Sequence, residues 1–480
     1  MPRFHVITFG CQMNSHDSAR MAETLSQAGY EEASGLDSAD VVVLNTCSVR
    51  EKAEQKLRSE VGRLALRKAE RPGMILAVAG CVAQQEGEKL LRQMPDVDVV
   101  VGPDNIAELP LLVADAEAGV PPQVRTVFDL DAPRFLQAAP RPGRVEPTAY
   151  VTIMKGCNER CSFCIVPTTR GPERYRPSAE IVEEIARLVD AGVREVTLLG
   201  QTVNSYTDPS RALPPAPLAG EGVKRWGARA RGDETEFPAL LRAIAERVPG
   251  LLRLRYTSPH PRHLTPALVQ THRDLPVLAR HVHLPVQSGS DRMLKRMIRR
   301  YDVAEYHERV GLLREEVPGV TLSTDVIVGF SGEGRGDFES TLELLARVRF
   351  SGVFAFKYSV RPKTPAEHLP DDVPEAEKEA RLAAVLELTE RIRREHLGSL
   401  VGSRAEVLVE GPGKTGGYTG RTERNEIVHF ASAEDPTGTV LPVEITRAFK
   451  NSLEGRLPEG LRVPTRERAS SPERRSLPVI

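Results

Sequence analysis

The first hundred residues of the chain alternate continuous apolar runs with amphipathic, charged stretches. The apolar runs have the length of strands and are rich in Val, Ile and Leu, whereas the charged stretches have the length of helices. The predicted strands are residues 4–9, 41–46, 74–80 and 97–101, and the predicted helices are 15–28, 50–68 and 84–93. Strands that are apolar along their whole length are typical of a parallel sheet covered on both faces. We therefore predict an N-terminal, Rossmann-like α/β domain.

The same alternation returns in the middle of the chain. The predicted strands there are 150–154, 195–199, 252–257, 281–285, 321–328 and 353–358, and helices such as 178–190 fit between them. Eight βα units close a (β/α) barrel, whereas this stretch has room for six. The pattern predicts an open, partial (β/α)6 barrel, with its chemistry at the C-terminal ends of the strands.

The hydrophobic and polar pattern changes in the last part of the chain. A long, highly charged helix is predicted at 374–397, followed by short β-like runs at 404–410, 427–430 and 439–445. Gly-rich and Pro-rich turns separate these runs, which is typical of a small β-barrel. The overall prediction is an α/β protein with a small C-terminal β-barrel.

Proline-rich and glycine-rich stretches mark the predicted domain boundaries. Residues 207–236 break the barrel pattern with several prolines and glycines and are predicted to be a surface insertion. The tail is rich in Arg, Ser, Pro and Glu, which is typical of disorder. The predicted parts are an N-terminal domain (1–118), a linker (119–147), the barrel domain (148–397), the β-barrel domain (398–460) and a disordered tail (461–480).

Composition narrows the class of protein. The 480 residues include 65 basic and 66 acidic side chains, for a net charge of -1. Nucleic-acid-binding domains are often strongly basic, so the total charge does not indicate one, although local patches can still bind RNA. No apolar run reaches the ~20 residues of a membrane span, and the first residues lack the apolar core of a signal peptide. We expect a soluble, cytoplasmic protein that does not bind membranes.

Three of the six cysteines lie in one short loop: Cys157, Cys161 and Cys164. Their spacing resembles the signature of radical S-adenosylmethionine (SAM) enzymes, and Phe163 before the third cysteine fits the same pattern. Three thiolates on a 4Fe–4S cluster leave one iron without a protein ligand, and in such enzymes that iron binds SAM. A zinc site would need a fourth ligand nearby, which the following residues do not offer. Three buried thiols without a metal are the remaining alternative.

The other three cysteines each follow a predicted strand of the N-terminal domain. Cys11, Cys47 and Cys81 lie at the C-terminal ends of three parallel strands, which share one edge of the sheet. They can therefore meet in space and hold a second 4Fe–4S cluster, although buried structural thiols are an alternative. Gly10 and Gly80 precede two of them and would allow close backbone approach.

Several further motifs accompany the cysteines. They are residues 10–14 (GCQMN), 17–18 (DS), 45–53 (NTCSVREKA), 156–158 (GCN), 161–167 (CSFCIVP), 170–171 (RG), 199–201 (LGQ), 204–206 (NSY), 283–290 (HLPVQSGS), 324–330 (TDVIVGF) and 419–422 (TGRT) with Asn425. With these motifs the chain resembles the methylthiotransferase family of radical SAM enzymes along nearly its whole length, and most closely its MiaB-type tRNA enzymes. The long insertion and residues 334–336 (GRG) depart from the family pattern.

The resemblance implies a reaction and its cofactors. Cys157, Cys161 and Cys164 would hold the cluster that cleaves SAM to a 5′-deoxyadenosyl radical. The other three cysteines would hold an auxiliary 4Fe–4S cluster that carries the sulfur to be transferred. One SAM would methylate that sulfur, and a second would supply the radical that activates C2 of the adenine. The substrate would be N6-dimethylallyladenosine at position 37 of tRNA, and the product its 2-methylthio derivative.

The resemblance also suggests binding residues and partners. The candidates for contact with the SAM cofactor are Phe163, Gly200, Gln201, Gln287, Ser288, Asp325 and Gly329, with polar packing at strand ends as the alternative. The candidates for RNA contact in the C-terminal TRAM domain are Arg421, Arg424, Arg447 and Lys450, with a solvated basic face as the alternative. The expected partners are the anticodon arm of tRNA and an electron donor such as flavodoxin or ferredoxin, and we expect a monomer.

Other functions remain open at this stage. The chain could methylthiolate threonylcarbamoyladenosine in tRNA or an aspartate of a ribosomal protein, since related enzymes share the architecture. It could also be an iron–sulfur or zinc RNA-binding protein without turnover. Open iron sites argue against a purely structural cluster, which would have four protein ligands.

Overall fold

The computed structural model describes residues 1–48, 51–138, 146–211, 234–414 and 416–463. Most of the predicted insertion (207–236) and the predicted disordered tail from residue 464 on lie outside these ranges. The chain forms two compact units, Met1–Ile392 and Arg393–Ile480, which are described separately.

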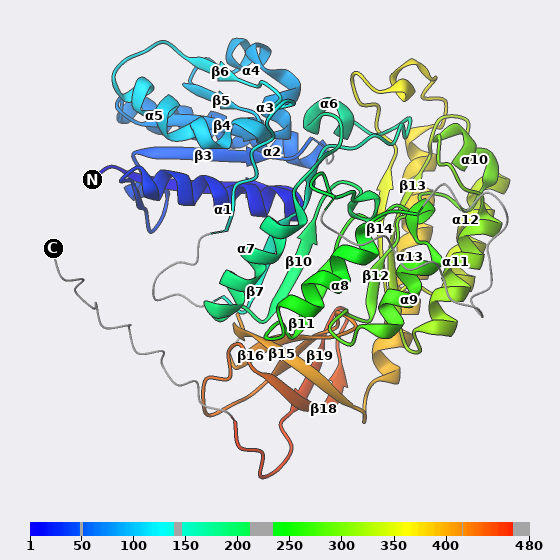
Figure 1. Cartoon of the computed structure of the whole chain (residues 1–480). Coiled ribbons are helices and arrows are strands. Elements are labelled where there is room, and N and C mark those ends of the chain that lie inside the picture. Colours follow the sequence, from blue (N-terminus) through cyan, green and yellow to red (C-terminus); the bar gives the residue numbers. More distant parts are fainter. Residues whose placement is uncertain (49–50, 139–145, 212–233, 415, 464–480) are drawn as a thin grey trace. The chain divides into compact units, whose positions relative to one another are not determined.

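The first unit begins with a six-stranded sheet in the order β2-β1-β3-β4-β5-β6. Figure 1 labels β3, β4, β5 and β6 of this sheet. All of its strand pairs are parallel. The strands are β1 (Arg3–Phe9), β2 (Glu31–Glu32), β3 (Val41–Thr46), β4 (Ile75–Gly80), β5 (Val99–Val101) and β6 (Gln123–Arg125). Sequence patterning identified four of them, and it missed β2 and β6 because two or three residues are too few for a pattern. The sheet thus extends into residues 119–147, the predicted linker.

Helices cover both faces of this sheet because neighbouring residues of each apolar strand point to opposite sides. Val41 and Val43 pack in one core with α1, and Val42 and Leu44 pack in another with α2. The helices are α1 (Gln12–Gln27), η1 (Leu36–Ser38), α2 (Glu51–Glu70), α3 (Cys81–Glu86), α4 (Glu88–Gln93), η2 (Pro103–Glu108) and α5 (Leu109–Glu117). The predicted helix 84–93 is in fact two helices, since Gly87 between them has a positive φ of 50°.

The predicted partial barrel follows, with all six of its predicted strands present. They are β7 (Thr148–Thr152), β10 (Glu195–Leu199), β11 (Arg253–Tyr256), β12 (His281–His283), β13 (Thr321–Val328) and β14 (Gly352–Lys357). They form two parallel three-stranded sheets, β11-β10-β7 and β12-β13-β14. A bridge between Leu254 and Leu278 connects β11 to the segment that leads into β12. One continuous core fills the space between the strands and the surrounding helices.

Helices and short strands complete the barrel. The helices are α6 (Val166–Arg170), α7 (Ser178–Asp190), η3 (Val203–Ser205), α8 (Phe237–Arg247), η5 (Pro261–His263), α9 (Pro266–Asp274), α10 (Asp291–Arg296), α11 (Val303–Glu316), α12 (Arg335–Val348), η6 (Pro365–His368) and α13 (Glu375–Ser399). A small antiparallel pair, β8 (Met154–Lys155) and β9 (Arg174–Tyr175), frames the loop that carries the second group of cysteines.

The second unit contains a closed barrel in the order β15-β16-β17-β19-β18. Its strands are β15 (Arg404–Pro412), β16 (Tyr418–Thr422), β17 (Ile427–Phe430), β18 (Val440–Ala448) and β19 (Leu453–Arg456). Sequence patterning missed β16 and β19, which are short and contain glycine and charged residues.

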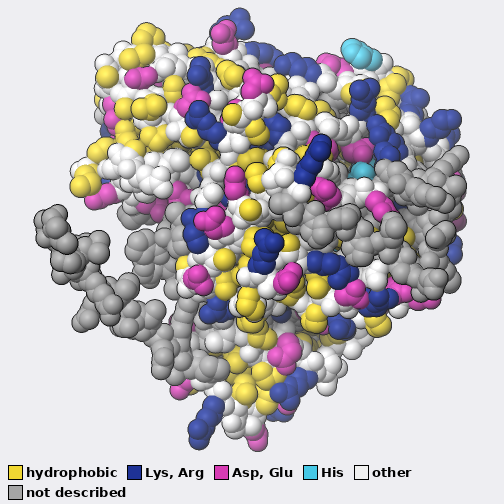
Figure 2. Space-filling model, in the orientation of Figure 1, with side chains coloured by type: hydrophobic (Ala, Val, Ile, Leu, Met, Phe, Trp, Pro, Cys, Tyr) yellow, Lys and Arg dark blue, Asp and Glu magenta, His cyan; other side chains and the backbone are white. Residues whose placement is uncertain are grey.

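The surface agrees with the balanced composition. On the face shown in Figure 2, basic and acidic side chains are interspersed rather than gathered by sign. Among the helices that the structure describes, none is both long enough and apolar enough to cross a membrane.

Candidate iron–sulfur and SAM site

The N-terminal triad (Cys11, Cys47 and Cys81) lies at one edge of the first sheet. In the sheet register Phe9 pairs with Thr46, and Thr46 pairs with Gly80. The three strands therefore end level with one another, and each is followed within two residues by a cysteine. Cys47 and Cys81 are buried, and Cys11 is partly exposed.

Polar contacts hold the first two cysteines of this triad together. A hydrogen bond with Cys47 lowers the pKa of the Cys11 thiol to about 6. The Cys11 Sγ also lies 3.3 Å from Asn14 Oδ1, and Asn14 Nδ2 donates to Asn45 Oδ1 at 3.0 Å. Burial raises the pKa of Cys81. A metal that displaces the thiol protons would overcome this cost, because metal binding releases the protons of its ligands.

Two glycines allow the backbone to pass close to neighbouring side chains at this sheet edge, as the sequence predicts. A Cβ on Gly10 would lie 2.6 Å from Cys47 Cβ, and a Cβ on Gly80 would lie 2.3 Å from Asn45 Oδ1. Gly80 also has a φ of +92°, which other residues rarely adopt.

The loop triad (Cys157, Cys161 and Cys164) lies between β8 and α6. Cys157 and Cys161 are buried, and Cys164 is partly exposed. Cys157 Sγ lies 3.1 Å from the hydroxyl of Thr202. Burial raises the pKa of Cys157 to about 11 and that of Cys164 to about 12. The loop therefore offers three candidate sulfur ligands, two of them buried.

Each triad has a buried arginine beside it. The Arg170 Nε donates to Cys81 Sγ at 3.3 Å, and the Arg299 Nη1 donates to Cys161 Sγ at 3.2 Å. Both guanidinium groups are buried, and both stay charged at any relevant pH. A positive charge beside buried sulfur ligands suits an anionic thiolate cluster, so the donor set and its surroundings fit 4Fe–4S clusters. A single metal ion is a different case from a cluster. Within the described ranges, no group of three or more His, Cys, Asp or Glu residues is placed to hold one.

The candidate cofactor residues gather near the C-terminal ends of the barrel strands. Gly200 and Gln201 follow β10, and a Cβ on Gly200 would lie 2.5 Å from Met154 Cγ. The Gln287 amide donates to the carbonyl of Asp325 at 2.9 Å, and the Asp325 carboxylate lies 3.4 Å from His283 Nε2. A SAM-binding role for these residues stays a prediction.

The remaining cofactor candidates make packing contacts. Ser288 is fully buried, and its Oγ lies 3.3 Å from the hydroxyl of Thr341. The Gly329 amide donates to Glu333 Oε2 at 2.6 Å, and Phe163 packs against a small apolar cluster behind the loop. Their contact with SAM also stays a prediction.

The candidate RNA residues all lie in the second unit. Arg421 Nε forms an ion pair with Glu410 at 2.9 Å. The Arg447 guanidinium lies 5.0 Å from the ring centre of Phe449, which is 39% exposed. A cation beside an exposed aromatic ring is one arrangement that binds single-stranded RNA. RNA binding by these residues stays a prediction.

Comparison with known proteins decides the family. Residues 3–102 match a family described as uncharacterized protein family UPF0004, residues 151–345 match the radical SAM superfamily, and residues 398–457 match the TRAM domain. A tRNA-2-methylthio-N6-dimethylallyladenosine synthase of Sorangium cellulosum is 61% identical over 100% of this chain and 99% of its own length. The chain belongs to the tRNA-2-methylthio-N6-dimethylallyladenosine synthase family. Synthases of the same name from Acidithiobacillus ferrooxidans (98% of this chain, 99% of the relative) and Myxococcus xanthus (97% and 96%) are each 44% identical.

Membership of this synthase family confirms several sequence-based predictions. They are the α/β fold class with a TRAM β-barrel, the radical SAM methylthiotransferase activity, and SAM with two 4Fe–4S clusters as cofactors. A solved radical SAM methyltransferase from Kitasatospora setae aligns with a TM-score of 0.49 at 14% identity, over 86% of this chain and 81% of that one. That likeness is too weak to add to the assignment.

Sequence patterning missed the polar residues that touch the cysteines. Arg170 stands in a motif that the sequence analysis noted without a role, directly after the loop triad. Arg299 and Thr202 lie far from the cysteines along the chain, and no spacing marks them. For Arg170 the signal was its place in the motif, whereas the other two became visible only in the fold.

Proposed function

We propose that this chain methylthiolates C2 of N6-dimethylallyladenosine at position 37 of tRNA. The observation that carries the proposal is the full-length similarity to named synthases, together with six cysteines arranged in two triads within one compact unit. The loop triad would hold the SAM-binding cluster, and the N-terminal triad would hold the auxiliary cluster. When bound, these clusters and SAM supply the reducing electron, the radical and the methylthio group.

The chain's own residues position and shield this chemistry. Arg299 and Arg170 each place a buried positive charge on a cysteine sulfur, which offsets the negative charge gathered by thiolate ligands. Cys47, Cys81, Cys157 and Cys161 are buried, so water is kept from most of the ligand sulfurs. Exclusion of water protects a reactive radical from side reactions.

The substrate and other partners follow from the same proposal. The tRNA would present adenosine 37 as an unstacked base, because single-stranded RNA loops are read in that form. Arg421, Arg424, Arg447 and Lys450 would contact phosphates of the anticodon arm. We also propose a flavodoxin or ferredoxin as electron donor, a monomeric enzyme, and action in the cytoplasm, where tRNA is modified.

The test begins with iron and sulfide content after anaerobic reconstitution. We expect about eight irons per wild-type chain, and about four when the loop triad is replaced by alanine. Near four and near zero would mean that the N-terminal triad binds no cluster, and the sulfur-transfer proposal would then fail.

The second step uses three substrates in parallel. They are tRNA that carries N6-dimethylallyladenosine, tRNA that carries threonylcarbamoyladenosine, and ribosomal protein with the target aspartate. We expect a 2-methylthio product from the first alone, detected by mass spectrometry of the nucleosides and peptides. Turnover of either other substrate in place of the first would reassign the specificity.

A further inference from the structure

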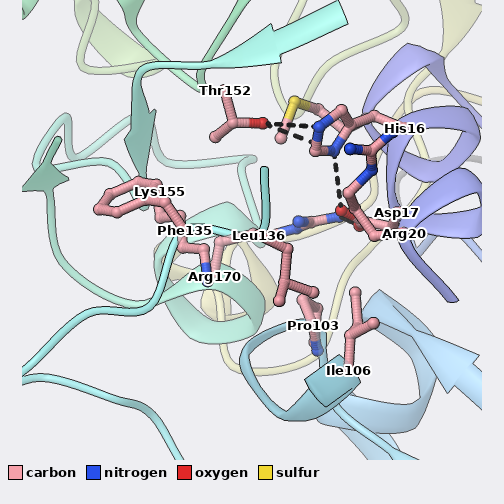
Figure 3. A pocket seen from close by; sticks show the side chains of 11 residues that line it. His16, Asp17, Arg20, Pro103, Ile106, Phe135, Leu136, Thr152, Lys155 and Arg170 are labelled. Atoms are coloured by element: carbon pink, nitrogen blue, oxygen red, sulfur yellow. Dashed lines mark hydrogen bonds and ion pairs between the residues drawn. The ribbon is translucent and has the colours of Figure 1, made fainter. Parts of the chain in front are cut away.

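Arg170 follows the loop triad in the sequence, but its side chain contacts the N-terminal triad. It ends α6, which begins two residues after Cys164 of the loop triad. Its side chain nevertheless reaches the N-terminal domain, where Nε donates to Cys81 Sγ at 3.3 Å and Nη2 donates to Asp17 Oδ2 at 2.6 Å. In Figure 3 the Arg170 guanidinium lies against Asp17 of α1. One side chain therefore joins the two regions that hold the cysteines.

The contact is made away from water. Arg170, Asp17 and Cys81 are each 6% exposed. Burial opposes ionisation of Asp17, yet Arg170 and His16 lower its pKa to about 2, so the carboxylate is charged. His16 Nδ1 lies 3.7 Å from this carboxylate and is also near the hydroxyl of Thr152 (Figure 3). Asp17 thus shares the charge of Arg170 with the sulfur of Cys81.

A second arginine fixes the backbone of Arg170 without touching the cysteine. Arg174 Nη2 donates to the carbonyl of Arg170 at 2.6 Å. Its Nη1 forms an ion pair with Asp104 and donates to the carbonyl of Asp129 at 2.9 Å. Arg174 therefore ties the same segment to the N-terminal domain, which makes it a matched control for a purely structural role.

We propose that Arg170 is a positioning residue that links the two cluster loops and sets the electrostatic environment of the N-terminal triad, with Asp17 limiting the charge that reaches Cys81. The inference rests on the proposed assignment of an auxiliary cluster to that triad. A hydrogen bond and a positive charge on a ligand sulfur stabilise the reduced form of a cluster and raise its reduction potential. Removal of Arg170 should therefore lower the potential, whereas neutralisation of Asp17 should raise it.

The opposite signs of these two expected shifts in reduction potential provide the test. The full-length chain with the loop triad replaced by alanine is reconstituted anaerobically, so that only the N-terminal triad can hold a cluster. Arg170→Met, Arg170→Lys, Asp17→Asn and Arg174→Met are then introduced separately. The midpoint potential of each is measured by a redox titration followed by electron paramagnetic resonance, and iron content is measured beside it.

We expect Arg170→Met to lower the potential, Asp17→Asn to raise it, and Arg174→Met to leave it unchanged. Arg170→Lys should lie between Arg170→Met and the parent, since it keeps the charge but not the planar guanidinium. Unchanged potentials, or shifts of the same sign, in variants that retain iron would overturn the inference while leaving the proposed function intact.

A folding defect can be separated from a shift in the midpoint potential. Arg170→Met leaves the Asp17 carboxylate buried without its partner, which is strongly destabilising. The double variant Asp17→Asn/Arg170→Met removes both charges, so it should fold and should have a lower potential than Asp17→Asn alone. Equal potentials in those two proteins would overturn the inference. A parent that binds no iron would overturn both the cluster assignment and this inference, whereas methylthiolation by the wild-type enzyme tests the function separately.

Discussion

The three cysteines of each triad are brought together in different ways. The N-terminal triad is assembled from three strand ends, so the register of a parallel sheet brings its members together. The loop triad comes from one short segment between β8 and α6, and its members are neighbours before the chain folds. Sheet topology therefore determines the first site, and local chain conformation determines the second.

The arginines beside the triads differ as well. Arg170 shares its charge with the Asp17 carboxylate at 2.6 Å. Arg299 contacts neutral oxygens, with Nη2 3.0 Å from the Pro285 carbonyl and Nε 3.0 Å from the Tyr301 hydroxyl. More positive charge is thus directed at Cys161 than at Cys81. The same residue type therefore stands in a different electrostatic environment at each triad.

The largest expected difference follows from removing one ligand of each triad. Cys157→Ala should reduce SAM cleavage to background, because only two thiolates would remain for the proposed SAM-binding cluster. Cys47→Ala should stop methylthiolation but leave measurable SAM cleavage. The amounts of 5′-deoxyadenosine and of methylthiolated tRNA, measured anaerobically, distinguish these outcomes. Full methylthiolation by either variant would contradict the division of labour between the triads.

Replacement of a glycine by alanine beside each triad tests whether the backbone there has room for a Cβ. A Cβ on Gly156 would lie 1.9 Å from the Pro172 carbonyl oxygen, which is backbone and cannot swing away. A Cβ on Gly80 would first meet the side chain of Asn45. Both glycines have positive φ, where an alanine costs a further ~1–2 kcal/mol. We expect each alanine variant to lose about half of the bound iron, and Gly156→Ala to be the less stable of the two.

Iron analysis and thermal unfolding measure both effects. Gly311→Ala is the control, since Gly311 lies exposed in α11 with nothing within 4 Å of an added Cβ. It should keep all of its iron and gain up to about 1 kcal/mol from improved helix propensity. Full iron content in Gly80→Ala would show that close backbone approach is not required at the sheet edge.

The difference between the triads also explains what sequence can predict. The continuous apolar runs around Val41–Thr46 and Ile75–Gly80 identify buried parallel strands. Once these strands are placed, Cys47 and Cys81 must lie at one edge. The six barrel strands follow from the same reasoning, with their bounds shifted by a few residues at the ends. The fold class and the placement of these cysteines are therefore readable from sequence because they depend on pattern and topology, whereas their role as cluster ligands stays a prediction.

The polar environment of the ligands could not be predicted in the same way. Arg299 reaches Cys161 from a segment beyond α10, and Thr202 reaches Cys157 from the turn after β10. Such contacts depend on the reach and orientation of side chains after packing, which leave no period in the sequence. Strands such as β6 and β19 were missed for a simpler reason, since they are too short or too polar to show alternation.

A smaller effect is expected from the arginine beside the loop triad. Arg299→Met removes the hydrogen bond and the charge at Cys161, and loss of such a contact costs about 10–100-fold in metal affinity or activity. We expect slower SAM cleavage by this factor, with part of the rate restored in Arg299→Lys. The rate of 5′-deoxyadenosine formation with a chemical reductant is the measurement. Arg300→Met is the control, since Arg300 is the next residue, its side chain is 45% exposed, and its guanidinium lies 3.9 Å from the Glu159 carboxylate rather than beside a cysteine sulfur. An equal loss in both variants would remove the specific role of Arg299.

The last expected difference concerns pH and the domain that holds the loop triad, and it affects stability rather than activity. His272 in α9 is buried, with its Nε2 2.6 Å from the Tyr256 hydroxyl. Burial lowers the pKa of His272 to about 4, against about 6.5 in an unfolded chain. Between these values the unfolded state binds more protons than the folded state, so stability falls as pH falls. The loss should be on the order of 3 kcal/mol between pH ~6.5 and ~4.

Urea unfolding of the metal-free chain at several pH values, followed by circular dichroism, checks this prediction. His272→Gln has no titrating ring, so its unfolding midpoint should fall less on acidification than that of the wild type. His368→Gln, which replaces an exposed histidine, should behave like the wild type. If His272→Gln and the wild type lose stability equally, acid acts through groups shared by the whole chain. A smaller loss in His272→Gln would instead place part of the acid sensitivity in the barrel, so that the two triads would differ in the stability of their scaffolds as well as in their arginines.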